Sequence, residues 1–152
     1  MPSNISRGCG RSGLLAKKVF FDTNPLIYFV SGYEPYYSKV FDFFTECIEN
    51  DVEFYTSTIT DAEFLSKPFR DGNFGVVERY KIWLRKLDFL KCFITEQVAE
   101  KAAFVRAKYQ SIKLADALQI AASLECNCDV FFTNDKQLKQ ITEIKVVYLG
   151  EL

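Results

Sequence analysis

The sequence contains no histidine among its 152 residues. This absence excludes Ser-His-Asp and Cys-His triads, metal sites with histidine ligands, and proton transfer through an imidazole. An enzyme with this sequence must therefore take its chemistry from carboxylates, hydroxyls, lysines or a metal ion that is held by oxygen atoms.

A large excess of charge of one sign is also missing. The 19 Lys and Arg residues nearly balance the 20 Asp and Glu residues, so the formal net charge is −1. This balance argues against a protein that coats nucleic acid through bulk positive charge. Hydrophobic residues make up 49% and charged residues 26% of the chain, which is typical of one globular domain.

Long apolar runs are absent too. No stretch approaches the ~20 apolar residues that a membrane span requires. Residues 1–16 contain only Leu14-Leu15-Ala16 as an apolar run, so we expect no secretory signal. We therefore predict a cytoplasmic protein that has no contact with a membrane.

Cysteines are few and scattered. The sequence contains Cys9, Cys47, Cys92, Cys126 and Cys128. The closest pair has one intervening residue, not the C-x-x-C spacing of zinc knuckles and redox dithiols. We therefore expect reduced thiols, as is usual in the cytosol.

Residues 1–16 are rich in Ser, Gly and Arg and lack periodicity, which predicts a flexible leader before a single domain at 17–152. This leader contains Gly8-x-Gly10-x-x-Gly13, which has the spacing of the dinucleotide-binding motif. The motif binds phosphate only where a buried strand precedes the glycines. Residues 1–7 do not form such a strand, so we reject phosphate binding here.

From residue 17 onward, short apolar runs alternate with longer amphipathic segments. The apolar runs predict strands at 19–21, 52–55, 92–94, 130–132 and 146–148. The amphipathic segments predict helices at 36–49, 58–67, 76–90, 96–109, 116–124 and 136–140. A further helix is expected to begin at Asn24-Pro25, with Asn24 as its N-cap. This order indicates an α/β fold whose central, mostly parallel sheet is covered by helices on both faces.

In such sheets, ligands bind beyond the carboxyl ends of the strands, where two acids are expected. Asp22 directly follows the first strand, and with Asn24 as the helix cap its carboxylate is free for a site. Asp135 follows the fourth strand in the same way. Capping of the 136–140 helix is an equally good explanation for Asp135.

Two more acids lie on predicted helices. Asp116 begins an amphipathic helix, where a negative residue also suits the helix dipole. It borders the apolar face, however, and carboxylates are rarely placed beside buried surface without compensation. Glu63 lies next to the apolar face of its helix, and a solvated glutamate is the simpler interpretation. Asp61 is expected to point elsewhere.

If folding gathers these four carboxylates, they would raise one another's pKa. A hard divalent cation would relieve this repulsion, and oxygen-only ligands favour Mg²⁺ or Mn²⁺ over zinc. Such an ion activates water and polarises a phosphoryl oxygen. The residues thus predict metal-assisted hydrolysis, a chemistry that needs no histidine.

Four short motifs in this order resemble the PIN-domain nucleases, most closely the toxin ribonucleases of prokaryotic type II toxin–antitoxin pairs. They are Val19-Phe20-Phe21-Asp22-Thr23-Asn24, Thr56-Ser57 with Glu63, Asp116-Ala117-Leu118-Gln119-Ile120-Ala121, and Phe131-Phe132-Thr133-Asn134-Asp135. The resemblance covers essentially residues 17–150. It implies a PIN-like, three-layer α/β/α sandwich and a metal-dependent endoribonuclease.

The resemblance also implies roles for particular residues. The acids Asp22, Glu63, Asp116 and Asp135 would hold Mg²⁺ or Mn²⁺ and activate water for RNA cleavage. The residues that would orient a carboxylate or a metal-bound water are Thr23, Asn24, Ser57 and Thr133. For Ser57, helix capping is at least as good an explanation. The resemblance further suggests a homodimer and a small antitoxin as partner.

RNA binding requires positive charge near the site. Basic residues that could supply it are Arg79, Lys81, Arg85, Lys86 and Lys113. For all of these except Lys113, a solvated helix face is the simpler interpretation.

Two other functions fit parts of the pattern. One is a PIN-like module that binds RNA or protein without catalysis, although all four acidic positions are filled here. The other is a haloacid-dehalogenase-like phosphatase, which also has an aspartate after its first strand. That chemistry requires a second aspartate two residues later, where this sequence has Asn24.

Overall fold

The computed structural model describes residues 15–152. The glycine motif at residues 8–13 lies outside the described residues, as does most of the expected leader. Within 15–152, none of the helices combines the length and the apolar character that crossing a bilayer requires.

The centre of the molecule is one five-stranded sheet with the strand order β3-β2-β1-β4-β5. All four pairings are parallel, so the sheet is parallel throughout and not only mostly so. The strands are β1 (Lys18–Phe21), β2 (Glu53–Ser57), β3 (Leu90–Cys92), β4 (Val130–Thr133) and β5 (Lys145–Tyr148). In the register of the two central strands, Phe21 of β1 lies opposite Phe132 of β4.

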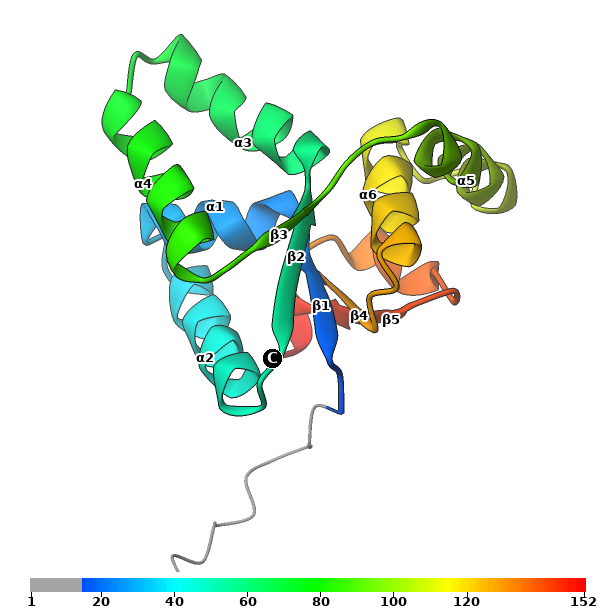
Figure 1. Cartoon of the computed structure of the whole chain (residues 1–152), viewed down its shortest axis with the longest axis horizontal. Coiled ribbons are helices and arrows are strands. Elements are labelled where there is room, and N and C mark those ends of the chain that lie inside the picture. Colours follow the sequence, from blue (N-terminus) through cyan, green and yellow to red (C-terminus); the bar gives the residue numbers. More distant parts are fainter. Residues whose placement is uncertain (1–14) are drawn as a thin grey trace, which may run out of the picture.

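Helices connect the strands and cover both faces of the sheet (Figure 1). The α-helices are α1 (Thr23–Ser31), α2 (Tyr36–Glu49), α3 (Thr58–Arg70), α4 (Phe74–Lys86), α5 (Glu96–Lys108) and α6 (Leu114–Glu125). Two short 3₁₀ helices, η1 (Lys136–Gln140) and η2 (Leu149–Glu151), flank β5. This arrangement confirms the predicted three-layer α/β/α architecture.

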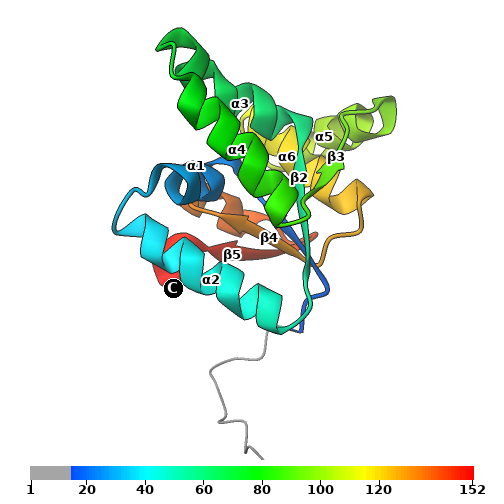
Figure 2. The ribbon, with the colours of Figure 1, turned by 60° about the vertical axis from the view of Figure 1, so that its left-hand side comes forward.

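Consecutive side chains of a strand point to opposite faces, and β1 shows this directly. Phe21 packs in a cluster with residues of α1 to α4, including Phe44, whose ring is stacked on it at 4.6 Å. Phe20 packs on the other face with Ile120 of α6 and Phe131 of β4. Figure 2 shows α1 to α4 on one side of the sheet and α5 and α6 on the other. The two clusters hold the carboxyl ends of β1 and β4 rigidly in place.

Several element boundaries differ from the predicted ones. Helix α3 continues past Pro68 to Arg70, although the proline has no N–H to donate to the carbonyl of Phe64. Helix α4 begins at Phe74 because the side chain of Asn73 caps it by accepting a hydrogen bond from the Val76 N–H. It ends at Lys86, which leaves Leu90–Cys92 as the third strand instead of 92–94.

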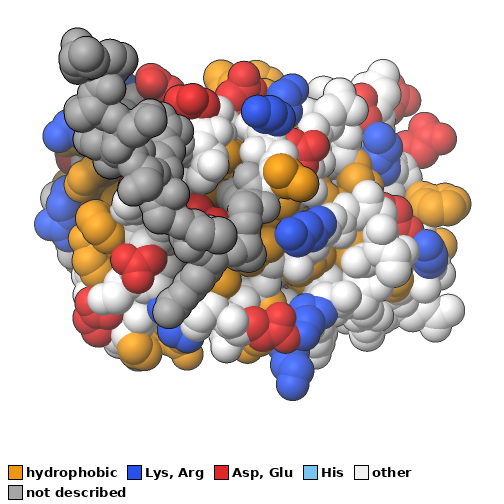
Figure 3. Space-filling model, turned by 90° about the horizontal axis from the view of Figure 1, so that it is seen from below, with side chains coloured by type: hydrophobic (Ala, Val, Ile, Leu, Met, Phe, Trp, Pro, Cys, Tyr) orange, Lys and Arg blue, Asp and Glu red, His pale blue; other side chains and the backbone are white. Residues whose placement is uncertain are grey.

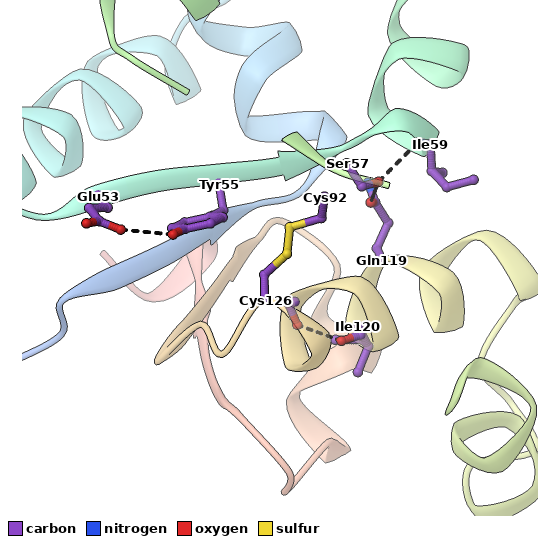
Figure 4. The surroundings of a disulfide bond; sticks show 9 residues. Glu53, Tyr55, Ser57, Ile59, Cys92, Gln119, Ile120 and Cys126 are labelled. Atoms are coloured by element: carbon purple, nitrogen blue, oxygen red, sulfur yellow. Dashed lines mark hydrogen bonds between the residues drawn. A yellow bond between two sulfur atoms is a disulfide. The ribbon is translucent and has the colours of Figure 1, made fainter. Parts of the chain in front are cut away.

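The expectation of reduced thiols is wrong for two of the cysteines. Cys92 at the end of β3 and Cys126 at the end of α6 form a disulfide, with their Cα atoms 6.5 Å apart (Figure 4). Because 34 residues separate the two cysteines, the spacing between neighbouring cysteines in the sequence does not predict this pair. Only the packing of α6 against the sheet brings them together. Cys47 and Cys128 are buried free thiols.

Candidate active site

The site lies at the carboxyl ends of the two central strands. From β1 the chain moves to β2 and β3 on one side, and it then crosses to β4 and β5 on the other. Ligands of open parallel sheets bind at this kind of switch point, because the connections leave in opposite directions and open a crevice. The backbone N–H of Asp22 donates to the carbonyl of Phe132 over 2.9 Å, so the two strands are still joined where the site begins.

Asp22 lies at this switch point, directly after β1, and is only 5% exposed. It is the N-cap of α1, with one carboxylate oxygen accepting from the N–H of Thr23 at 2.8 Å. Its other oxygen accepts from the hydroxyl of Thr133 at 2.7 Å. The prediction that Asn24 caps this helix is therefore wrong. The helix begins two residues earlier because Asp22 already provides the acceptor.

Burial and, to a smaller extent, the charges of Asp116 and Glu63 raise the pKa of Asp22 to about 6. The hydrogen bonds from Thr133 and from the Thr23 N–H act in the opposite direction. Acids from three separate elements are therefore close enough to interact electrostatically.

Asp116 lies in the first turn of α6 and is partly buried. Burial raises its pKa, and the charges of Asp135 and Glu63 add to this effect. Lys113, three residues earlier, lowers it. Asp116 thus interacts electrostatically both with Glu63 of α3 and with Asp135, which follows β4.

Glu63 lies on the exposed side of α3 and turns toward α1. One of its carboxylate oxygens accepts from the hydroxyl of Thr23 at 2.7 Å. Asp61 points away, as expected, and accepts from Tyr80 at 2.7 Å and from Lys91 at 2.6 Å. The two acids of this helix therefore face different surroundings.

Asp135 follows β4 and caps η1, since its side chain accepts from the Gln137 N–H at 2.9 Å. Its own N–H donates to the hydroxyl of Thr133 at 3.0 Å. Thr133 thereby contacts both Asp22 and Asp135. Asp135 has the capping duty that we considered and also contributes to the charge felt by Asp116.

The remaining predicted site residues differ in position. Ser57 is buried and caps α3, and its hydroxyl donates to the side chain of Gln119 instead of to an acid. Asn24 is exposed, and no hydrogen bond joins it to any of the four acids within the described part of the chain. Thr23 and Thr133 are the two predicted residues that hydrogen-bond to a carboxylate.

A buried polar group behind the crevice was missed by sequence reasoning. Gln119, Thr56 and Thr60 are all fully buried, and the amide of Gln119 contacts the hydroxyls of Thr60 and Thr23. One signal was available, because Gln119 interrupts the apolar face of its helix between Ala117 and Ile120. A polar side chain in such a place requires polar partners.

Four of the predicted RNA-binding residues, including Arg79, lie on α4, whereas Lys113 precedes α6. Lys113 is near Asp116, whereas Lys81 and Arg85 line a cavity of about 750 Å³ beside Asp61. Lys86 lies in a hollow with Glu53, which begins β2, so it is at the opposite end of the sheet from the acids. Figure 3 views the molecule from that end, and its visible acidic and basic side chains are interspersed.

The donor chemistry of the site fits a hard divalent cation, because it consists of carboxylate and hydroxyl oxygens. Neighbouring negative charge also contributes to the raised pKa of Asp22 and of Asp116. Within residues 15–152, however, no three acidic or thiol side chains are arranged so that all could hold one ion as they stand. Asp22 and Glu63 are instead held by hydrogen bonds to Thr23 and Thr133.

These features define an α/β/α protein with an all-parallel sheet and a group of interacting acids at its topological switch point. The family model of the PIN domain matches residues 19–144. The chain belongs to the PIN-domain family, as the sequence motifs suggested.

Solved structures have the same fold. VapBC2 from Rickettsia felis, bound to a DNA fragment from their promoter, matches with a TM-score of 0.69 and 15% identity over 86% of this chain and 98% of that one. A toxin-antitoxin complex from Klebsiella pneumoniae matches with a TM-score of 0.63 and 22% identity, over 86% and 97%. The Mycobacterium tuberculosis VapC20, a Sarcin-Ricin loop cleaving toxin, matches with a TM-score of 0.60 and 16% identity, over 84% and 98%. Comparison with curated proteins finds no match.

Proposed function

We propose that this chain is a metal-dependent ribonuclease that cleaves RNA phosphodiester bonds at the Asp22 crevice. The observation that carries the proposal is the electrostatic coupling of Asp22, Glu63, Asp116 and Asp135, which come from four different segments of the chain. Gathering carboxylates costs stability unless a cation or a proton compensates for their charge. Because this protein gathers carboxylates at its topological switch point despite the loss of stability, we infer a metal-binding site there and not a purely structural cluster of acids.

Asp22, Glu63, Asp116 and Asp135 would hold Mg²⁺ or Mn²⁺. When bound, such an ion lowers the pKa of water and neutralises developing charge on a phosphoryl oxygen. Thr133 orients Asp22 through its hydrogen bond of 2.7 Å, and Thr23 orients Glu63 through another of 2.7 Å. Lys113 supplies positive charge beside Asp116, where an RNA phosphate could bind.

We further propose that the protein is the toxin of a toxin–antitoxin pair, with a small antitoxin as its partner. This is supported by the family and by the names of the similar structures, which include toxin–antitoxin complexes. Exposed aromatic residues such as Phe93 and Phe104 offer apolar surface for an antitoxin or for a second copy of the chain. Co-expression with the product of a neighbouring reading frame, followed by co-purification and an RNase assay, tests the antitoxin.

Cleavage of a structured RNA in the presence of Mg²⁺ or Mn²⁺ tests the ribonuclease activity. We expect cleavage by the wild type, and a loss of at least 100-fold in Asp22→Asn and Asp116→Asn. Asp42→Asn, at an exposed position of α2, is the matched control and should retain full activity. Cleavage that survives both substitutions would exclude this site. RNA binding without any cleavage by the wild type would favour a module without catalysis.

A further inference from the structure

Gln119 is a fully buried amide on α6, one turn after Asp116. Its carbonyl oxygen accepts from the hydroxyl of Ser57. Its amide nitrogen donates to the hydroxyl of Thr60 at 2.7 Å and to that of Thr23 at 3.4 Å. Gln119 thus joins α6 to residues of β2, α3 and α1. Figure 4 shows its side chain reaching Ser57 from α6.

Both sides of this amide are hydrogen-bonded. The N–H of Ile59 donates to the Ser57 hydroxyl at 3.1 Å as part of the cap of α3. The proton of that hydroxyl is donated to the carbonyl oxygen of Gln119. The NH₂ group of the same amide faces Thr60 and Thr23.

The carboxylate of Glu63 decides the direction of its bond to Thr23, because it can only accept. A hydroxyl has one proton, and Thr23 accepts a hydrogen bond from Gln119. Its proton is donated to the carboxylate of Glu63, which lies 2.7 Å away and can only accept. A continuous path therefore runs from Ser57 through Gln119 and Thr23 to Glu63.

We infer that Gln119 is a positioning residue that holds Glu63 in place through Thr23. The inference rests on the proposed function, because it assigns Gln119 to the same acidic site. Gln119 touches none of the four acids. It acts through the hydrogen bond that it donates to the hydroxyl of Thr23, which holds that hydroxyl beside Glu63. Through Thr60 it also links the helix that carries Asp116 to the helix that carries Glu63.

Substitutions at Gln119 and Thr23 test this role. Gln119→Leu keeps the approximate volume but removes both amide groups. Thr23→Val removes the hydroxyl, and Thr23→Ser keeps it. Ser123→Ala is the matched control on α6, because Ser123 is also fully buried but donates only to the carbonyl of Ile120 in its own helix. Thermal unfolding and circular dichroism establish that each variant is folded.

Mn²⁺ affinity by calorimetry and RNA cleavage by steady-state kinetics provide two readouts. We expect Gln119→Leu to weaken Mn²⁺ binding by about 10–100-fold, as is usual when the partner of a ligand is lost. The kcat should fall and the KM for RNA should change little. Thr23→Val should give the same losses, and the double variant should lose no more than either single one. Thr23→Ser and Ser123→Ala should resemble the wild type.

Additive losses in the double variant, or unchanged Mn²⁺ affinity in a folded Gln119→Leu, would overturn the inference. A third readout keeps it separate from the proposed function. The carboxyl ¹³C resonance of Glu63 in the metal-free protein should move in Gln119→Leu and in Thr23→Val, but not in Ser123→Ala. If the wild type neither binds Mn²⁺ nor cleaves RNA, the proposed function fails, and this resonance alone then decides the positioning role.

Discussion

At the scale of single residues, Asp22 combines two duties that are usually separate. Its carboxylate caps α1, a role that favours the ionised form, and it is also buried beside other acids, which disfavours that form. The result is a pKa of about 6. The folded protein therefore holds a proton on Asp22 at pH values where the unfolded chain has already released it.

Asp22 should consequently make the metal-free protein less stable as the pH rises. Its folded pKa of about 6 lies above the ordinary value of 3.8, so the folded state binds more protons between these two values. The free energy of unfolding then falls through this window by about 3 kcal/mol. Urea unfolding in EDTA at pH 4 and pH 7 should show that Asp22→Asn lacks this contribution. Its stability relative to the wild type should therefore improve toward pH 7.

Asp42→Asn, at an exposed position, serves as the control and should follow the wild type at both pH values. An Asp22→Asn variant with the same pH dependence as the wild type would show that Asp22 is ionised normally in the folded protein.

At the scale of elements, the residue that caps α3 also hydrogen-bonds to a buried side chain of α6. Ser57 ends β2, caps α3 and donates to Gln119. The same side chain therefore both starts a helix and satisfies a buried amide. The helices that carry Glu63 and Asp116 are joined at this point.

Ser57→Ala should cost more stability than the loss of an ordinary cap. Removing a cap costs about 0.5–2 kcal/mol, and leaving the buried carbonyl of Gln119 without a donor adds about 1–3 kcal/mol. Thr95→Ala provides the comparison, because Thr95 caps α5 but is exposed and bonds only to the Val98 N–H. Chemical denaturation should show a clearly larger loss for Ser57→Ala. Equal losses would mean that Gln119 finds another donor.

At the scale of the whole molecule, the sheet and the helical layer of α5 and α6 are joined covalently at one edge. The disulfide between Cys92 and Cys126 connects the edge strand β3 to the end of α6. This bond closes a loop around α5, which packs against α6. Such a bond stabilises a protein mainly by restricting its unfolded chain.

Reduction should therefore lower the free energy of unfolding by about 2–4 kcal/mol, given the sequence separation of 34 residues. Denaturation with and without a reducing agent measures this, and the double variant Cys92→Ser, Cys126→Ser should match the reduced wild type. Burial raises the pKa of Cys47 and Cys128 to about 12, so neither should react with iodoacetamide in the folded protein. A double variant that still responds to the reducing agent would contradict the assignment of the bond.

A divalent cation that binds the folded protein alone should stabilise all of it. At a hundredfold excess over its Kd, Mg²⁺ or Mn²⁺ should add about 2.7 kcal/mol to the free energy of unfolding. Removal of the ion with EDTA should abolish this gain. Asp116→Asn should show little of it, whereas Asp42→Asn should show all of it. Equal stabilisation of Asp116→Asn by the ion would place its binding elsewhere.

The fold could be predicted from the sequence because it depends on local patterns. Short apolar runs such as Val19-Phe20-Phe21 between amphipathic segments can be buried only as strands of a parallel sheet that is covered on both faces. The rule that ligands bind at strand ends then selected Asp22 and Asp135 directly. The motif resemblance and the family match agree with this prediction.

Three features depended on contacts between distant segments and were decided only by the tertiary structure. The disulfide required α6 to pack beside β3. The buried position of Gln119 required hydroxyls from β2, α3 and α1 to meet one amide. The raised pKa of Asp22 required its burial and, to a smaller extent, the approach of Asp116 and Glu63. The amino-acid sequence by itself thus determined which segments become strands and helices, because periodicity is local. The tertiary structure decided which side chains share an environment, because charge, burial and bonding depend on distance in space.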